Sequence, residues 1–243
     1  MLPYLRLEVL RVLRNKTFLI LNLGMPIGFY LLFTSLFGGT TVRGVDQTVQ
    51  FMVSMAAFGG MGAALWGTGP RIAQERQLGW LRQLRATPLP AREVITAKVL
   101  AALVLALPAL ILVSIVGVVV HGVHLAAWQW AAMLALLWVG ALPFAALGVL
   151  IGSLTNTEAS QIATNGVYLV LAALGGLWMP VKILPSVLQH VAHALPSNRY
   201  GELGWQIVAG HAPTLASGLV LAAWTVGVGA LAAYAYRRRE AVR

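Results

Sequence analysis

The sequence predicts an all-α membrane protein that crosses the bilayer six times. Hydrophobic residues make up 59% of the 243 residues and charged residues only 10%, and the mean hydropathy is +0.80. A soluble domain carries about 25% charged residues, so this composition excludes that class. Uncharged stretches of about 20 residues, the length that spans a bilayer, recur along the chain. We therefore treat residues 1–243 as a single transmembrane domain.

The segment before the first span, residues 1–16, is expected to form a short interfacial helix. Arg11 and Arg14 lie on one face and Glu8 on the flank, while Leu7 and Leu10 fall on the polar side, so the amphipathic pattern is imperfect. The apolar face consists of Leu2, Leu5, Val9, Val12 and Leu13. Amphipathic basic helices of this kind rest in the headgroup plane. A basic leader that only orients the first span is the alternative, and the pattern leaves both open.

The spans follow from the distribution of charge. Residues 17–37, 47–70 and 99–157 contain no charged residue, but the third stretch is 59 residues long, too long for one helix. His121-Gly122-Val123-His124 divides it into two spans. Thr155-x-x-Glu158 predicts a capping box before the fifth span. The six expected spans are Thr17–Phe37, Gln47–Pro70, the two halves of Val99–Thr157, Ala159–Val181 and Pro213–Tyr236.

The positive charges fix the expected orientation. With both termini in the cytoplasm, the outer segments hold only 3 of the 17 Lys and Arg residues, namely Arg43, Lys182 and Arg199. Cytoplasmic loops of membrane proteins carry such an excess of cations. The cations flank apolar runs and do not alternate with aromatic residues, which argues against nucleic-acid binding. The expected location is the cytoplasmic membrane of a bacterium.

Residues 71–90 form the long basic segment between the second and third spans. Six Lys and Arg residues fall between Arg71 and Lys98, and apolar residues recur at helical spacing, as in Trp80 with Leu84. A positively charged amphipathic element at the cytoplasmic surface is suited to contact another protein. The segment therefore indicates a machine whose motor is a separate chain.

Residues 179–211, between the fifth and sixth spans, are too polar and too rich in proline to cross the bilayer. They are also too apolar for an ordinary solvated loop. Pro185 can begin a short helix that Pro196 ends, and a second can run from about residue 198 to residue 208 before Gly210. Two short helices satisfy their own backbone without spanning. We expect a re-entrant helical hairpin on the extracellular side.

These two regions together resemble the permease subunits of type-2 ATP-binding-cassette (ABC) exporters. The individual motifs are short, but their order and spacing match over nearly the whole chain. In the cytoplasmic segment the matching residues are Glu75-Arg76, Gly79, Leu81, Leu84, Thr87-Pro88 and Lys98. In the outer region they are Gly175-Gly176, Trp178-Met179-Pro180, Leu184-Pro185, Leu195-Pro196 and Tyr200.

The resemblance implies a cytoplasmic coupling helix that sits in a groove of the ATPase subunit. It assigns that contact to Glu75, Arg76, Gly79, Leu81, Arg82, Leu84 and Arg85. The family's acidic pair at the start of the segment is here Glu75-Arg76. These two residues would form either an ion pair with the motor or an internal brace, while Arg82 and Arg85 would meet either lipid headgroups or the partner.

The resemblance also implies two ATPase subunits that bind ATP and Mg, and a second permease chain. This chain has no Gly-Lys dipeptide and hence no Walker A lysine, so no cofactor is expected in it. Six spans enclose too small a path for a large cargo, which favours a path between two copies. The glycines of the second span, Gly59, Gly60 and Gly62, would permit close helix approach.

The candidate path residues carry aromatic, thioether or amide side chains. Polar side chains at membrane depth usually face the bundle interior, so the amides either line the path or join helices. The aromatic residues either meet the cargo or simply pack. Such surfaces suit a hydrophobic or amphipathic molecule, such as a drug-like natural product, a lipid or a lipid-linked glycan. The residues are Asn22, Met25, Phe51, Met55, Phe58, Asn165 and Tyr168.

An ion-coupled secondary transporter and an intramembrane enzyme are the alternatives. Ion-coupled carriers place ionisable residues at mid-membrane, whereas the six expected spans hold none. His121 with His124 and His190 with His193 have metal-like spacing, but each pair lacks a neighbouring carboxylate or thiol. The chain has no cysteine, and no Ser-His or carboxylate pair lies at one depth. The sequence therefore favours ATP-driven transport.

Overall fold

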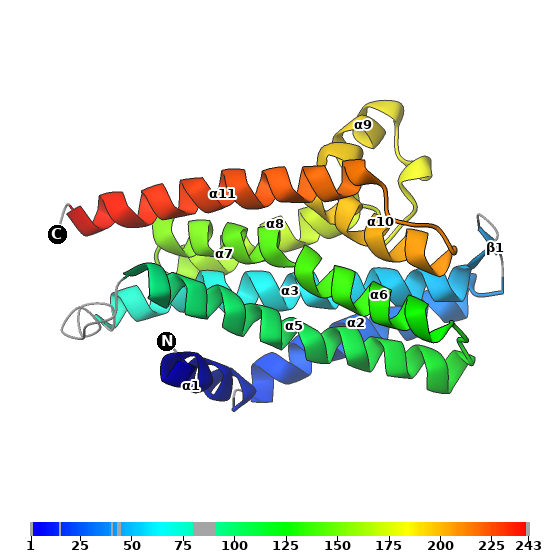
Figure 1. Ribbon diagram of the computed structural model, residues 1–243, viewed down its shortest axis with the longest axis horizontal. Helices are drawn as coiled ribbons and strands as arrows, with labels where there is room; N and C mark the ends of the chain where they lie inside the picture. The colour runs from blue at the N-terminus through cyan, green and yellow to red at the C-terminus, as the bar shows by residue number, and fades with distance from the viewer. Residues whose placement is uncertain (1, 15, 40, 43–44, 80–90, 242–243) are drawn as a thin grey trace.

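The computed structural model describes residues 2–14, 16–39, 41–42, 45–79 and 91–241. These residues form an elongated bundle of helices (Figure 1). Both termini lie toward one end of the bundle, which we call the near end. A short hairpin and the helices α9 and α10 lie at the opposite, distal end. This arrangement places the two predicted functional regions at opposite ends of the molecule.

The helices agree with the hydrophobic runs of the sequence. The near-end helix is α1 (Leu2–Leu13), and the long or paired helices of the bundle are α2 (Lys16–Phe37), α3 (Gln47–Gln77), α5 (Ala91–His121), α6 (Ala127–Gly140), α7 (Leu142–Leu154), α8 (Thr157–Leu174) and α11 (Leu215–Ala241). The distal end carries β1 (Thr41–Val42), β2 (Val45–Asp46), the 3₁₀ turn η1 (Val181–Ile183), α9 (Ser186–Ala194) and α10 (Pro196–Val208).

Four helical stretches among the described residues are long and apolar enough to cross a membrane. They are Gln47–Gln77, Glu93–His121, Ala127–Leu154 and Leu215–Ala235. The apolar part of α2, Asn22–Phe37, is shorter, and α8 is only 18 residues long and begins with polar residues. The structure therefore confirms a helical, multi-pass membrane protein. The count of six spans stays a prediction that depends on α2 and α8.

Helix α3 occupies the centre of the bundle and contacts α2, α5, α7, α8 and α10. Its residues from Phe51 to Leu65 are all buried. Small residues let α7 approach its backbone, because a Cβ added at Gly148 would collide with Thr68 Oγ1 and one at Gly152 with the Gly69 carbonyl. Thr68 Oγ1 lies 3.2 Å from the Ala145 carbonyl oxygen, within hydrogen-bond distance. The two helices thus meet along their backbones.

Several boundaries differ from the prediction. Helix α3 continues past Pro70 to Gln77, so the beginning of the expected coupling segment is an extension of this helix. Helix α8 ends at Leu174 and not at residue 181, because Gly176 adopts a φ of 80° in the turn that follows. The helical stretch 127–154 is interrupted at Ala141, two residues before Pro143. Proline cannot donate the backbone hydrogen bond that a continuous helix needs.

The predicted capping box before α8 is wrong. Asn156 caps this helix, with its Oδ1 accepting from the Ala159 amide at 2.8 Å. Thr155 Oγ1 instead donates to the Ile151 carbonyl at 2.7 Å, which makes Thr155 part of the end of α7. An Asn side chain competes well with Thr at an N-cap.

The distal region consists of short helices, as predicted. Pro185 precedes α9, Pro196 begins α10, and Gly210 follows α10 with a φ of 80°. The β1–β2 hairpin was not predicted, since two-residue strands leave no pattern in the sequence. It leads into α3, whose first turn is capped by Asp46 Oδ1 accepting from the Thr48 amide at 2.8 Å.

We predict that Gly148→Ala destabilises the bundle. The new methyl group would force Thr68 and the Leu65 carbonyl away, and such overpacking costs about 1–3 kcal/mol. The matched control is Gly227→Ala on α11, where a Cβ meets no atom within 4 Å and helix propensity favours Ala. Thermal unfolding in detergent should show a lower midpoint for Gly148→Ala only. Equal midpoints would contradict the proposed backbone contact.

Candidate functional site

A buried network of charged side chains joins three helices at the near end. Lys98 Nζ on α5 lies 3.0 Å from Glu8 Oε1 on α1 and 2.5 Å from Glu75 Oε2 on α3. Arg11 Nη1 lies 3.3 Å from Glu75 Oε1. We call Glu8, Arg11, Glu75 and Lys98 the near-end charge network.

The network pairs buried carboxylates with cations. Glu8, Glu75 and Lys98 are each at most 7% exposed. Removing an ion from water costs several kcal/mol, and only close oppositely charged partners offset this cost. Arg11 and Lys98 contact the carboxylates directly, and Arg71 on α3 lies near enough to interact electrostatically with both of them. The arrangement therefore holds α1, α3 and α5 in one relative position.

Arg76 fastens α3 to the end of α7. Its Nη1 donates to the Gly152 and Ser153 carbonyls at 2.8 and 2.7 Å. Carbonyls at a helix C-terminus lack intrahelical partners and carry partial negative charge, which favours a guanidinium there. The Gln77 and Thr157 side chains also form a hydrogen bond. The near end of α3 is thus attached to α7 and to the start of α8.

These contacts bear on the residues predicted to meet an ATPase. Glu75 and Arg76 have partners inside the chain, which favours the brace alternative over direct contact with a motor. Gly79 follows the C-cap residue of α3 and has a φ of 71°, a conformation that favours glycine. The other predicted contact residues, Leu81, Arg82, Leu84 and Arg85, lie outside the described residues, and their role stays a prediction.

Sequence reasoning missed the pairing of Glu8 with Lys98. The two residues are 90 positions apart, and no local pattern links them. A signal did exist, because Glu8 is the only acidic residue before Asp46 and Lys98 immediately precedes a 59-residue uncharged stretch. A lone charge among apolar residues often marks a buried pair.

Aromatic side chains fill the space between α2, α3 and α8. Phe58 stacks on Tyr168 with ring centroids 4.4 Å apart, and Tyr168 donates to the Phe58 carbonyl at 3.3 Å. Phe29 packs against Phe58, and Phe33 stacks on Phe51 at 5.6 Å. These five residues and Trp178 form the aromatic cluster. It includes three of the predicted path residues.

The predicted path residues divide into two groups. Phe51, Met55, Phe58 and Tyr168 are buried, with at most 7% of each exposed. Asn22 is half-buried, whereas Met25 and Asn165 are exposed. The structure therefore does not bring all seven together along one open surface. The four buried residues pack inside the bundle, whereas Met25 and Asn165 lie on its surface.

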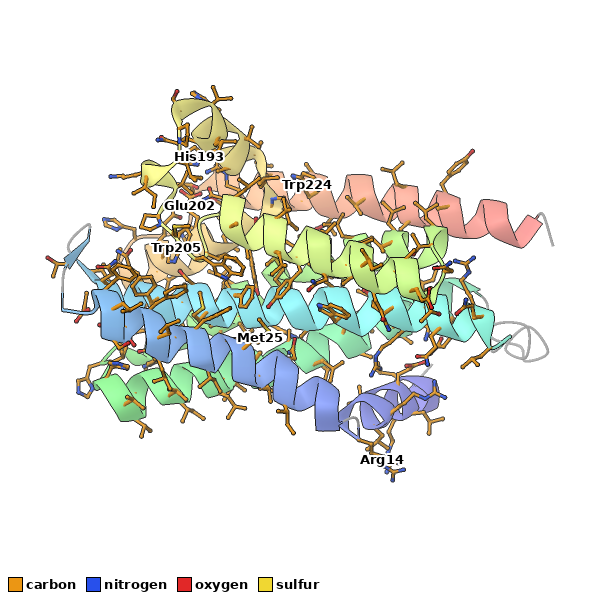
Figure 2. The ribbon with its side chains drawn as sticks, turned by 180° about the vertical axis from the view of Figure 1, so that it is seen from behind. Arg14, Met25, His193, Glu202, Trp205 and Trp224 are labelled. Carbon is orange, nitrogen blue, oxygen red and sulfur yellow. The ribbon has the colours of Figure 1, made fainter. Side chains whose placement is uncertain are left out.

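The exposed group belongs to a face on which α2 and α8 flank α3, with Met25 on α2 (Figure 2). On α8 the exposed side chains of this helix include Gln161 and Asn165, one turn apart, with Gly166 beside them. Lipid offers no hydrogen-bond partner for an amide. If α8 spans the bilayer as predicted, its exposed amides are suited to contact protein or a polar path.

The histidines make local contacts. His190 Nδ1 lies 2.8 Å from the Ser186 carbonyl oxygen, and the His121 ring packs edge-on against Tyr30. Among the described residues, no three His, Asp or Glu side chains are grouped so as to hold a metal ion.

Comparison with known proteins identifies the class. Residues 4–203 match the family described as "ABC-2 type transporter". The chain therefore belongs to this family and is the permease subunit of an ABC transporter, which confirms the resemblance. Membership implies association with an ABC ATPase.

A relative of the same length supports this assignment. Over 237 residues the chain is 35% identical to "Putative transport permease YvfS" of Bacillus subtilis (strain 168), which covers 97% of this chain and 96% of the relative. The matched region thus spans nearly the whole chain, from the near end to the distal helices.

We predict that Lys98→Met destabilises the protein by about 3–5 kcal/mol, because it leaves buried carboxylates without their shared partner. The control is Arg14→Gln, whose exposed side chain lies beyond the end of α1. The free energy of unfolding in detergent is measured for both variants. The double variant Glu8→Gln with Lys98→Met should cost less than the sum of the single variants. Additive effects would contradict the ion pair.

Proposed function

We propose that this permease is one half of a dimer that exports a hydrophobic or amphipathic molecule from a bacterial cell. The cargo would be a drug-like natural product, a lipid or a lipid-linked glycan. The observation that carries the proposal is the exposed, amide-bearing face of α2 and α8 beside the buried aromatic cluster. A second copy placed on this face would cover Gln161 and Asn165, and the buried aromatic cluster would line the path once α2 and α8 separate.

The energy would come from two ATPase subunits that bind ATP and Mg. The basic segment 80–90 follows α3 directly and would dock on them. Both chain termini, the end of α3 and the start of α5 lie at the near end (Figure 1). In the sequence, fourteen of the 17 Lys and Arg residues belong to the two termini and to the stretch 71–98. The positive-inside rule therefore supports a cytoplasmic near end in the cytoplasmic membrane.

The near-end charge network and the Arg76 hydrogen bonds suggest how a movement of the ATPase subunits would reach the bundle. ATPase closure would move the near end of α3, and Arg76 would carry α7 with it. The near-end charge network would carry α1 and α5. Because α8 is tied to α3 through the stacked pair Phe58 and Tyr168, this motion would strain the aromatic cluster. Separation of α2 from α8 would then open the path.

The chemistry of the path supports the cargo class. Its candidate residues offer aromatic, thioether and amide groups, and none of the seven is ionisable near neutral pH. Flexible and flat apolar surfaces tolerate varied cargo shapes. A long polysaccharide would require a more continuous polar corridor and ranks behind the other candidates. Family membership gives no support to the ion-coupled carrier or to the intramembrane enzyme.

We predict that an ATPase copurifies with the wild-type permease and that Glu75→Gln and Gly79→Ala weaken coupling. Glu75→Gln removes a charge from the brace, and Gly79→Ala strains a positive-φ position. Substrate-stimulated ATP hydrolysis should fall about 2- to 30-fold, with membrane insertion unchanged. Gly227→Ala is the control. A wild-type permease that binds no ATPase would overturn the proposed function.

We predict that a cysteine at Asn165 joins two permease chains. The native sequence has no cysteine, so a single introduced thiol reports only its own position. Val226→Cys on α11, which is 71% exposed in the wild type, is the matched control. Crosslinked dimers should form in membranes with Asn165→Cys. If only Val226→Cys crosslinks, the interface lies on another face.

A further inference from the structure

The distal end contains a cavity that none of the predicted path or coupling roles explains. Its volume is about 370 Å³, within the range of small-molecule sites. The walls come from the first turns of α3, the segment between α8 and α9, α10, and the residues that follow α10. Figure 2 shows His193 of α9 close to Glu202 and Trp205 of α10, and all three line this space. We call this space the distal cavity.

Aromatic side chains form one part of the wall. Trp205 Nε1 donates to Ser54 Oγ at 3.0 Å, which fixes the indole on α10 against α3. Trp178 packs edge-on against Phe29 and Phe58 with centroids 5.8 and 5.6 Å away. Both indoles line the cavity, as does Phe51. The apolar surface is therefore held in place before any ligand binds.

Polar side chains form the rest of the cavity wall. Their hydrogen bonds within the protein determine which of their atoms can still bond to a ligand. Asn198 Nδ2 donates to the Gly175 carbonyl at 3.0 Å, so its Oδ1 faces His193 Nδ1 at 3.2 Å. A proton on His193 Nδ1 satisfies this contact, and in the neutral imidazole Nε2 is then an acceptor. Gln206 Oε1 accepts from the Thr214 amide at 2.8 Å, which leaves the Gln206 Nε2 as a donor.

Glu202 is the one acidic side chain that the described residues bring to this cavity. Its Oε2 accepts from Arg199 Nη1 at 2.7 Å and from Ser217 Oγ at 2.8 Å. The carboxylate charge is thus compensated, and Oε1 remains an acceptor. Trp178 Nε1 is buried and has no hydrogen-bond partner among the residues that the structure describes.

This combination selects among ligand classes. A cation would need a carboxylate without a partner, and Arg199 already pairs with Glu202. Among the described lining residues, an anion would find one permanently positive side chain, Lys182, and that side chain is exposed to solvent. A purely apolar group would leave the donors and acceptors unpaired, which is costly. A neutral polyhydroxyl group both donates and accepts, and the C–H face of a sugar ring can lie on an indole.

We propose that the distal cavity binds a neutral polyhydroxyl group, such as a glycosyl unit, on the headgroup of the exported amphiphile. This inference rests on the proposed function and narrows its cargo to molecules with a hydroxylated head and an apolar tail. The head would bind here as the cargo reaches the distal end, while the tail follows the aromatic path.

The test measures binding to the permease alone, in lipid nanodiscs without an ATPase. The probes are methyl β-glucopyranoside, octyl β-glucopyranoside below its micelle concentration, and 1-octanol. Saturation-transfer NMR reports which probe binds, with empty nanodiscs as background. We expect both glucosides to bind. The signal of 1-octanol should be the same in the wild type and in variants that alter the cavity. Tighter binding of the octyl than of the methyl glucoside identifies an amphiphile headgroup.

Two variants alter the cavity in different ways. Trp205→Phe removes part of the aromatic wall, and Ala209→Trp fills the space without removing a polar contact. Each should weaken glucoside binding about tenfold, equivalent to about 1.4 kcal/mol. The matched control is Trp224→Phe on α11, whose indole donates to the Ala194 carbonyl at 2.9 Å and is not part of the cavity wall.

The outcomes separate this inference from the proposed function. Unchanged glucoside binding in both cavity variants, or equal loss of 1-octanol binding, would overturn the polyhydroxyl site. Equal affinity for the two glucosides would indicate a free sugar and overturn the link to an amphiphilic cargo. Failure of an ATPase to copurify would overturn the proposed function and leave the binding result unaffected.

Discussion

The central position of α3 is the constraint on which the rest of the bundle depends. This helix has almost no side chain left to face lipid, because every turn from Phe51 to Leu65 is buried. Glycines at its contact with α7 bring two backbones together, and aromatic rings fill the opposite side toward α2 and α8. A helix packed in this way cannot shift without displacing its neighbours. The bundle is therefore organised to pass on movement of α3.

The two ends of the molecule use different chemistry for different tasks. At the near end, charged groups are buried and mutually paired, so the relative position of α1, α3 and α5 is specified sharply. At the distal end, polar groups keep part of their hydrogen-bonding capacity next to aromatic walls. The first arrangement suits transmission of force, and the second suits recognition of a ligand. The aromatic cluster adjoins the distal cavity, because Phe51 and Trp178 belong to both.

The sequence predicted the helices well because hydrophobic runs and the prolines of the outer region are local signals. It did not predict which residues would face inward, since a helix that is apolar all round shows no preferred side. Phe58 and Asn165 were grouped as path residues, yet one is buried and the other exposed. Long-range pairs such as Glu8 with Lys98, and the contact of Arg76 with the end of α7, depend on tertiary packing that no local pattern encodes.

The interruption at Ala141 has a mechanical consequence. On its distal side, α6 is attached to α10, because the Gln129 side-chain amide donates to the Ile207 carbonyl at 2.9 Å. On its near side, α7 packs against α3 and α11 and holds the Arg76 guanidinium at its end. One transmembrane stretch thus belongs to two bodies, with a joint between them. Such a joint would let the near half tilt while the distal half stays seated, so that the path need never be open at both ends at once.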